Sequence, residues 1–367
     1  MSSRNILLTP GPIPVPEAVR KAMAEPILHH RTPQYRKIFE AASARIKGVF
    51  LTKNPVYTLT GSGTAAMEAA IVNFHNAGDE ILVVDSGKFG ERFTEIGKAY
   101  QLKPSVIKIP YGEAVKPEQI KEALQKNPNL KSVCVELCET STGVLQDIRA
   151  IGEIVSKTDA LLIVDAISGL GADRLETDKW NVDLAIAGSQ KALMLPPGLA
   201  FLSVSEKARK RMEKSTIPSY YLNIRLCEKA MKDWDTPFTP ALTIVIGLNK
   251  ALDLIEAEGI ENVFKRSAEL GEWTRAKLKS LGLELFSKAP SSTCSAASLP
   301  AGMDGEKLVK IMRDEKGVTL AGGQGEMKGK IIRIAHMGSI TRKDLEEGLK
   351  VLQETLEELK PKSASVH

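Results

Sequence analysis

The sequence predicts an α/β protein in which a parallel or mixed sheet is covered by helices on both faces. Short apolar runs, typical of buried strands, recur through the first two thirds of the chain, and helical patterns separate most of them. Alternation of this kind requires a layered α/β sheet. The length of 367 residues exceeds one ordinary core, so we expect a large domain and a smaller one.

The expected elements follow in chain order. Before residue 17, prolines at nearly alternate positions exclude helix and favour an extended arm. The large domain should then hold helices at 17–24, 33–49 and 64–74, and strands at 55–60, 80–85, 105–109, 131–138, 161–165, 184–187 and 199–204.

The pattern changes past Pro240. We expect helices at 242–258, 263–281, 304–314 and 342–359, and short strands near 283–286, 295–299 and 330–335. These elements indicate a smaller α+β domain joined by a long helix. The chain should therefore divide into an extended N-terminal arm (1–17), a large domain (18–256) and a small C-terminal domain (257–367), with a frayed tail from residue 361.

The composition is that of an ordinary globular protein, with 43% hydrophobic and 26% charged residues. The net charge of +5 is spread along the chain, which does not suggest nucleic-acid binding but leaves room for an anionic ligand. No apolar run has the length of a membrane span, and the N-terminus does not resemble a signal peptide. Cys134 and Cys138 would lie roughly 13 Å apart along a strand, too far for a disulfide. Free thiols and a cytoplasmic protein are the expectation.

Lys191 is the first candidate functional residue. It follows the apolar run 182–187 and the small or polar residues Gly188, Ser189 and Gln190, just before two prolines. A lysine in such a place could simply extend its amine to the surface. Alternatively, a desolvated amine loses its proton easily and can form a Schiff base.

A glycine-rich turn between a strand and a helix, Gly61-Ser62-Gly63-Thr64-Ala65-Ala66, is the second candidate. With Asp85 at the end of the next strand it fits the dinucleotide-binding pattern. It equally fits a single phosphate held by amide groups of a helix N-terminus and by two hydroxyls. A plain tight turn is the simplest alternative. The hydroxyls of Ser62 and Thr64 favour one phosphate.

Asp165 ends the buried strand 161–165, at the edge where ligands bind in open α/β sheets. A helix cap or a metal ligand is possible, but no second acid or histidine lies beside it, so we expect no metal site. A carboxylate that keeps a pyridine nitrogen protonated makes the ring an electron sink. Asp165 and Lys191 would hold such a ring between neighbouring strand ends.

Together these motifs resemble those of class V aminotransferases, and the alanine–glyoxylate / serine–pyruvate group is the most similar. The resemblance extends from Thr9-Pro10-Gly11-Pro12 to Arg333 and Gly338. It implies a pyridoxal-phosphate (PLP) enzyme of fold type I, the aspartate aminotransferase fold, with a three-layer mixed-sheet domain and a smaller α+β domain. The motifs that carry it are Ser62-Gly63-Thr64, Glu139-Thr140-Ser141-Thr142-Gly143-Val144, Asp165-Ala166-Ile167 and Gly188-Ser189-Gln190-Lys191.

The resemblance also implies a role for each motif residue. Lys191 would form the Schiff base and then move the proton between substrate and cofactor, and Asp165 would pair with the pyridine nitrogen. Arg333 would bind the substrate α-carboxylate, with Gly11 beside the substrate. The remaining cofactor contacts would be Ser62, Gly63, Thr64 and Gln190 at the phosphate, Phe89 and Ile167 on the two ring faces, Ser141 near the ring, and Thr239 from the other subunit of a homodimer.

The implied reaction is transamination between alanine or serine and glyoxylate or pyruvate. No second arginine is clearly placed for a distal carboxylate, although Arg31, Arg225 or His336 could reach the site. Aspartate or aminoethylphosphonate transamination is an alternative within the class. A cysteine desulfurase usually has histidine where Gln190 stands and a loop cysteine, whereas Cys294 lies in a strand-like stretch. An NAD-dependent dehydrogenase would leave Lys191 and Asp165 without roles.

Overall fold

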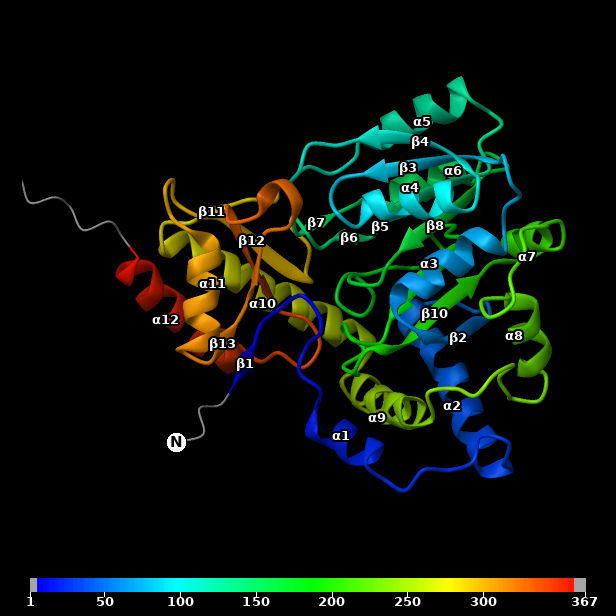
Figure 1. Ribbon diagram of the computed structural model, residues 1–367, viewed down its shortest axis with the longest axis horizontal. Helices are drawn as coiled ribbons and strands as arrows, with labels where there is room; N and C mark the ends of the chain where they lie inside the picture. The colour runs from blue at the N-terminus through cyan, green and yellow to red at the C-terminus, as the bar shows by residue number, and fades with distance from the viewer. Residues whose placement is uncertain (1–4, 360–367) are drawn as a thin grey trace, which may run out of the picture.

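A seven-stranded mixed sheet forms the larger part of the structure, a computed structural model that describes residues 5–359 (Figure 1). Its strands are β2 (Val56–Gly61), β3 (Glu80–Asp85), β4 (Lys103–Lys108), β5 (Ser132–Glu136), β8 (Leu161–Asp165), β9 (Leu184–Gly188) and β10 (Gly198–Val204). They lie in the order β2-β10-β9-β8-β5-β3-β4. Strand β10 is antiparallel to both of its neighbours, and the other strands pair in parallel.

Side chains of the sheet alternate between two apolar clusters, one on each face, as the pleat requires. One cluster includes residues of α3 (Gly63–Val72), α4 (Gly90–Ala99), α7 (Glu206–Met212) and α8 (Ile224–Met231). The opposite cluster includes residues of α2 (Pro33–Phe50), α5 (Pro117–Lys126), α6 (Ile148–Val155) and α9 (Leu242–Glu258). This arrangement confirms the predicted sheet with helices on both faces.

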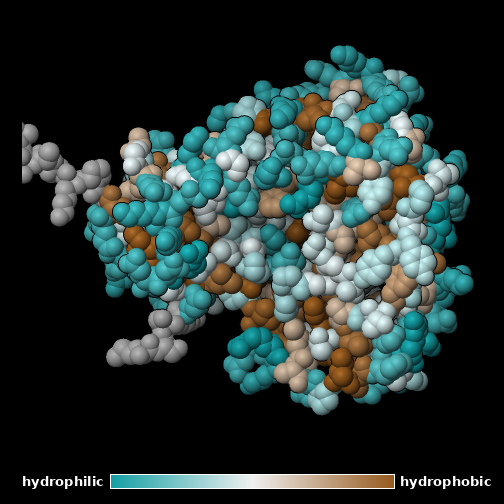
Figure 2. All heavy atoms as spheres, in the orientation of Figure 1, coloured by the Kyte–Doolittle hydropathy of each residue, from teal (hydrophilic) through white to brown (hydrophobic). Residues whose placement is uncertain are grey.

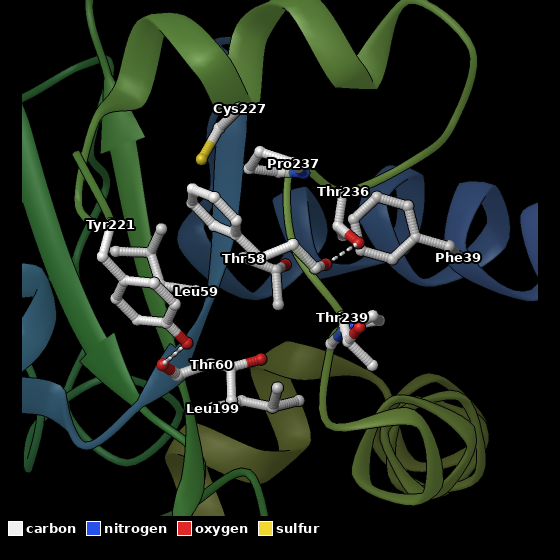
Figure 3. Close-up of a pocket in the computed structure, with 12 residues that line it drawn as sticks. Phe39, Thr58, Leu59, Thr60, Leu199, Tyr221, Cys227, Thr236, Pro237 and Thr239 are labelled. Atoms are coloured by element: carbon white, nitrogen blue, oxygen red, sulfur yellow. Dashed lines mark hydrogen bonds between the residues drawn. The ribbon is translucent and has the colours of Figure 1, made fainter. Parts of the chain in front are cut away.

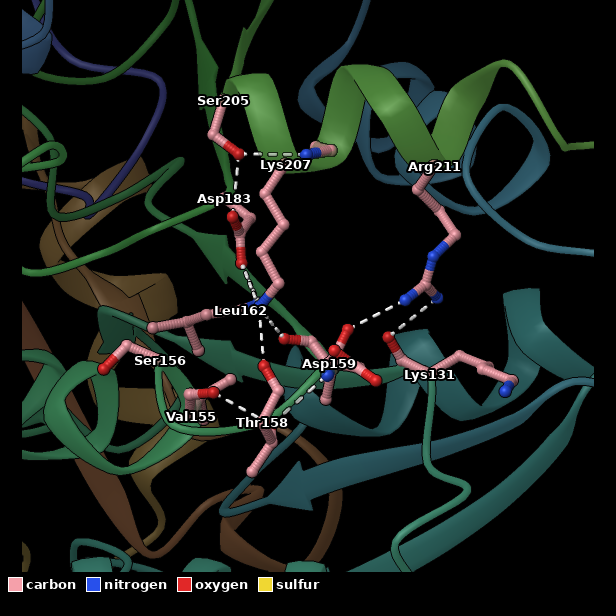
Figure 4. Close-up of polar contacts among 12 residues, drawn as sticks. Lys131, Val155, Ser156, Thr158, Asp159, Leu162, Asp183, Ser205, Lys207 and Arg211 are labelled. Atoms are coloured by element: carbon pink, nitrogen blue, oxygen red, sulfur yellow. Dashed lines mark hydrogen bonds and ion pairs between the residues drawn. The ribbon is translucent and has the colours of Figure 1, made fainter.

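A polar network fixes the amino ends of β8 and β9, opposite the ends that carry Asp165 and Lys191 (Figure 4). The Asp183 carboxylate accepts hydrogen bonds from Leu162 N (2.9 Å) and Ser205 Oγ (2.7 Å). Lys207 Nζ lies 3.6 Å from the same carboxylate and donates to the Ala160 carbonyl. Because both strands are held at this end, the carboxyl ends of β8 and β9 are also fixed in position relative to each other.

A four-stranded antiparallel sheet with the order β11-β12-β15-β14 forms the smaller part. Its strands are β11 (Glu284–Leu285), β12 (Cys294–Ser298), β14 (Ala321–Gly322) and β15 (Ile331–Ala335). Helices α10 (Ile260–Ser280), α11 (Gly305–Asp314) and α12 (Arg342–Glu358) accompany it. Helix α10 begins at Ile260, earlier than the predicted 263, because Gly259 ends α9 with a positive φ of 82° and the next helix starts at once.

Several short elements were not predicted. The strand expected at 131–138 is interrupted after Glu136, and its last residues belong to β6 (Cys138–Glu139), which pairs with β7 (Val144–Leu145). The arm contributes β1 (Ile6–Leu7), which pairs in parallel with β13 (Val318–Thr319) beside the small sheet (Figure 1). Two-residue strands show no alternation that a sequence pattern could reveal. The short helix η1 (Gly325–Met327) was not predicted either, whereas α1 (Glu17–Met23) matches the helix predicted at 17–24.

Within residues 5–359, no helix combines the length and apolar character that crossing a membrane requires. All four cysteines are free thiols, as predicted, and the structure shows that all four are buried. The tail predicted from residue 361 lies outside the described residues. The boundary at 256/257 falls near the end of α9 and remains a proposal.

Candidate active site

The carboxyl ends of β8 and β9 and the N-terminus of α3 converge on one pocket, with a volume of about 250 Å³. This is the edge of a parallel sheet at which ligands bind. The pocket brings together most of the predicted site residues: Gly11, Ser62, Gly63, Thr64, Phe89, Asp165, Ile167, Gln190 and Lys191.

Lys191 lies inside the pocket, where only 8% of it is exposed. The turn that carries it is held by Ser189, whose Oγ donates to Pro196 O (2.7 Å) and accepts from Leu199 N (3.1 Å). Lys191 Nζ donates to Pro10 O at 2.5 Å. Burial lowers the pKa of this amine. The interior position excludes the alternative in which the lysine extends to the surface.

Gly11 packs directly against Lys191. A Cβ atom at this position would lie 2.5 Å from Lys191 Cε and Nζ, and the backbone φ of +117° is one that glycine favours. Any side chain here would therefore displace the amine. Gly11 lines the pocket as expected, and its contact with substrate stays a prediction.

Asp165 is 5% exposed and its Oδ1 accepts a hydrogen bond from Ile167 N at 2.8 Å. Burial raises the pKa of this carboxyl to about 6, against the opposing effects of Ile167 N–H, Arg92 and Lys191. The register sets Asp165 beside Glu136 of β5. Glu136 is fully buried, neither of its carboxyl oxygens has a hydrogen-bond partner, and burial raises its pKa well above the usual range.

Glu139 fixes the start of α4 against the pocket. Its Oε2 accepts from Phe89 N (2.9 Å) and Gly90 N (3.0 Å), so the carboxylate meets unpaired amides of a helix N-terminus. Its Oε1 accepts from Ser141 Oγ at 2.6 Å. Phe89 therefore faces the pocket, whereas Ser141 is not among the lining residues and its hydroxyl is engaged by Glu139.

The start of α3 packs closely against Ile167. A Cβ at Gly63 would lie 2.4 Å from Ile167 Cδ1, so only glycine permits this approach. Ser62 and Thr64 flank it in the pocket wall. The arrangement suits an anion at a helix N-terminus.

Arg333 does not line this pocket, although it lies next to its wall. Arg333 is 4% exposed, and its guanidinium donates to the carbonyls of Gly322 (2.8 and 2.9 Å) and Thr140 (2.8 Å). Thr140 is one of the residues that line the pocket. Among residues 5–359 it pairs with no carboxylate, which excludes the structural ion pair that an arginine on an apolar face could otherwise form. Burial lowers its pKa.

Thr239 is exposed and lines a different pocket, between β2, β10 and the segment that leads to α9 (Figure 3). In that pocket Tyr221 Oη donates to Thr60 O at 3.1 Å, and Thr236 Oγ1 donates to Phe238 O at 2.7 Å. Thr239 therefore does not reach the Lys191 pocket of its own chain.

The other candidates for a distal carboxylate are occupied elsewhere. Arg31 pairs with Asp235 at 2.8 Å, and Arg225 donates to the carbonyls of Met212 and Ser215. His336 is fully buried between Ser295 Oγ (3.0 Å) and Ser292 O (2.8 Å), and burial lowers its pKa to about 3. None of the three lines the Lys191 pocket.

Sequence reasoning did not select several lining residues, namely Pro12, Arg92, Cys138, Thr140, Ser168 and Pro197. Pro12 and Thr140 lie within quoted motifs, and their position there could have indicated them. Arg92 and Cys138 carried no such signal, because their place depends on which strands become neighbours. No cluster of three or more potential metal ligands exists among residues 5–359.

The fold and the site match a known class of enzyme. The family model described as aminotransferase class-V matches residues 18–343. The chain is 35% identical to the serine–glyoxylate aminotransferase of Methylorubrum extorquens and 34% identical to the L-aspartate–glyoxylate aminotransferase of Paracoccus denitrificans, covering 93% of this chain and 88% of the relative in both cases. The crystal structure of alanine–glyoxylate aminotransferase from Nostoc sp. superposes with a TM-score of 0.93 at 29% identity, over 97% of this chain and 96% of that one.

These matches, together with the mixed sheet and its accompanying small sheet, define a fold type I transferase with aminotransferase activity. The chain belongs to the aminotransferase class V family.

The family's cofactor, PLP, fits the residues present. A primary amine, a buried carboxyl and a helix N-terminus with two hydroxyls surround one pocket, and these suit an aldehyde, a pyridine nitrogen and a phosphate. The amide oxygen of Gln190 is buried there without a hydrogen-bond partner, a polar group left for a ligand to satisfy.

Proposed function

We propose that this protein catalyses PLP-dependent transamination between a small amino acid, alanine or serine, and a 2-oxo acid, glyoxylate or pyruvate. The observation that carries the proposal is the buried Lys191 amine in one pocket with the Asp165 carboxyl and the α3 N-terminus. Bound PLP supplies an electron sink for the charge that develops at the substrate Cα.

Each residue has a task in this proposal. Lys191 would hold the cofactor through its amine and would serve as the base that moves the substrate proton, because burial favours its neutral, basic form. Asp165 holds a proton on the ring nitrogen. Ser62, Gly63, Thr64 and Gln190 hold the phosphate, and Phe89 and Ile167 orient the ring. Ser141 lies behind the pocket wall, where its hydroxyl donates to Glu139, so its part in this proposal is to support the start of α4 near the ring.

The substrate assignment rests on charge. Arg333 would bind the α-carboxylate, and the three groups considered for a distal carboxylate, Arg31, Arg225 and His336, are bonded elsewhere. That supports a donor with one carboxylate. Glyoxylate is the favoured acceptor, because it is named for all three relatives described above.

A homodimer with its active site at the subunit interface is part of the proposal. Thr239 is exposed, and Tyr220 (77% exposed) and Tyr221 (50% exposed) lie against Phe238 of the same segment. Apolar residues also gather at the surface in the region of α9, whereas the small-sheet part is mostly hydrophilic on this side (Figure 2). A cytoplasmic location agrees with four free thiols.

The test combines covalent trapping with a substrate panel. Borohydride reduction of the PLP-loaded protein should fix the cofactor on the peptide that contains Lys191, as read by mass spectrometry. Lys191→Ala should still bind PLP through phosphate contacts but lose transamination by ~10³-fold or more, since no other amine is positioned for proton transfer. Wild-type kcat/KM should be highest for alanine or serine with glyoxylate, in a panel that includes aspartate, aminoethylphosphonate, pyruvate and 2-oxoglutarate.

Lys88 provides the matched control, because it lies beside Phe89 but its amine pairs with Glu91 outside the pocket. Lys88→Ala should retain both the reduction at Lys191 and the activity. Appreciable turnover by Lys191→Ala without added amines would remove Lys191 from the mechanism.

A further inference from the structure

Arg92 lies in the Lys191 pocket and has no task in the proposed function so far. It is the third residue of α4, the helix whose start Glu139 fixes against the pocket. Its guanidinium carbon lies 5.0 Å from the centroid of the Phe89 ring, and its Nη1 donates to Thr64 Oγ1 at 3.3 Å. It is therefore held between a proposed ring contact and a proposed phosphate contact.

Within the described residues, the guanidinium of Arg92 does not pair with a carboxylate. Among residues 5–359 it forms no ion pair of the kind that joins Arg31 to Asp235 or Arg209 to Glu228. Burial raises the pKa of Asp165, and the positive charge of Arg92 opposes that rise. Among the charged side chains that lower this pKa, Arg92 has a larger effect than Lys191. An arginine directed into a pocket without a carboxylate partner is available to an anionic ligand.

The chemistry of PLP explains why one side chain could meet both ends. A single ring carbon separates the carbon that bears the phosphate arm from the ring nitrogen, so both groups lie along the same edge of the ring. In the pocket, Thr64 marks the phosphate end and Asp165 the nitrogen end. A planar guanidinium can lie over an aromatic face and donate in its plane at once, which an ammonium cannot do.

We propose that Arg92 is a positioning residue for the cofactor. Its guanidinium would lie along the ring edge that runs from the phosphate arm, near Thr64, to the ring nitrogen, near Asp165. This inference rests on the proposed function. By donating to Thr64 Oγ1, Arg92 leaves the single hydroxyl hydrogen of Thr64 free to be donated to the phosphate. Its positive charge attracts the phosphate and also favours the ionised form of Asp165, which is the form that keeps the ring nitrogen protonated.

The experiment compares Arg92→Gln and Arg92→Lys in the full chain. Apo-protein is titrated with PLP and with pyridoxal, which lacks the phosphate. For Arg92→Gln the Kd for PLP should rise by ~10-fold or more, and the Kd for pyridoxal should rise less, since one charge-assisted contact to the phosphate region is lost. The acid limb of the kcat–pH profile should also move to higher pH, because Asp165 ionises less readily.

Arg92→Lys should restore the pH profile in large part, because the charge remains, but not the affinity for PLP, because a lysine cannot hold both contacts. Exposed Arg149 on α6 is the control, and Arg149→Gln should change neither quantity. Unchanged PLP affinity and pH profile in Arg92→Gln would overturn the inference. So would a rise in KM for aspartate alone, which would make Arg92 a substrate contact.

Failure of this inference is distinguishable from failure of the proposed function. If the wild-type protein takes up PLP and borohydride fixes it on Lys191 while Arg92→Gln behaves as wild type, only the role of Arg92 is wrong. If the wild-type protein itself takes up no PLP, the proposed function fails. Far-UV circular dichroism and Tm of each apo-protein verify that the variants are folded.

Discussion

Asp165 destabilises the folded apo-protein, because its carboxyl group is buried without a full counter-charge. Its neighbour across the strand pair, Glu136, is buried more completely, and burial favours its neutral form. A neutral Glu136 spares the site a second negative charge directly beside Asp165. Arg92, Lys191 and the ring nitrogen of a bound cofactor are the groups that could then stabilise an ionised Asp165.

Replacing Asp165 by asparagine should therefore have opposite effects in the apo-protein and the loaded enzyme. The pKa of Asp165 rises from 3.8 to about 6 on folding. The folded state thus binds more protons than the unfolded state in this interval, and stability falls as pH rises through it. At pH 8 apo Asp165→Asn should be more stable than wild type by roughly 1–3 kcal/mol, and at pH 3 the difference should vanish. Denaturant unfolding of both apo-proteins measures this.

In the loaded enzyme the same substitution would remove the group that we propose keeps the ring nitrogen protonated. The value of kcat should fall by ~10²-fold or more while the fold persists. Asp233, which is exposed, is the control, and Asp233→Asn should alter neither property. A kcat close to that of wild type would mean that Asp165 only caps the strand end and that the ring lies elsewhere.

At the scale of elements, Arg333 depends on the pairing of β15 with β14 and β12. It stands opposite Ala321 and Ala296, and these small neighbours leave room for its side chain. Its guanidinium is oriented by the carbonyls of Gly322 in β14 and of Thr140 near β6, not by an acid. A charged group buried with only neutral acceptors is expensive, which is consistent with a place for an anion.

Substitution of Arg333 by lysine tests this role. Lysine keeps the charge but cannot form two parallel hydrogen bonds with a carboxylate. KM should rise by ~10-fold or more for both the amino acid and the 2-oxo acid, because both carry the same α-carboxylate, while PLP binding stays normal. Steady-state kinetics with each substrate varied in turn provides the measurement.

Arg275 of α10 is a suitable control, since it is partly buried and donates to the Ser291 carbonyl at 3.1 Å. Arg275→Lys should affect stability more than KM. Normal KM values with a lowered Tm in Arg333→Lys would show that Arg333 is structural and that the carboxylate anchor lies elsewhere.

The elements that sequence predicted best are those with long patterns. The strands 80–85 and 161–165 and the helix 242–258 have the predicted bounds, because an unbroken apolar run or a helical period defines them. Strands β1, β13 and β14 were missed, since two residues carry no period. For the same reason the contact between Arg333 and Gly322 of β14 could not be foreseen.

The pocket was predictable to a similar extent. Lys191 and Asp165 stood out because each is a charge at the end of an apolar run, and the structure brings both into one pocket. Arg92 and Cys138 did not stand out, because only the order of the strands and the placement of α4 turn them toward the same cavity. Sequence also could not show that Arg31 and Arg225 are bonded elsewhere.

At the scale of the whole molecule, distant parts of the chain close the site. Lys191 of the large-sheet part donates to Pro10 of the arm, and Arg333 of the small sheet donates to Thr140. One apolar cluster also extends from the large sheet into the small-sheet part. Thr239 is the exception, because it is exposed and lines a separate pocket, and a second subunit would be needed to give it a role at a phosphate.

Hybrid dimers test that role. Lys191→Ala and Thr239→Asp subunits, each with its own affinity tag, are co-expressed, and the species that carries both tags is purified. Each homodimer should be nearly inactive, the first because it lacks the amine and the second because a carboxylate faces the phosphate. If Thr239 acts across the interface, the hybrid holds one intact site and should show about half of the wild-type activity per dimer. The control hybrid of Lys191→Ala with Asp165→Asn should stay inactive, because both residues line the pocket of one chain. An inactive Lys191→Ala/Thr239→Asp hybrid would place Thr239 at the site of its own subunit, and a protein that never carries both tags would contradict the dimer itself.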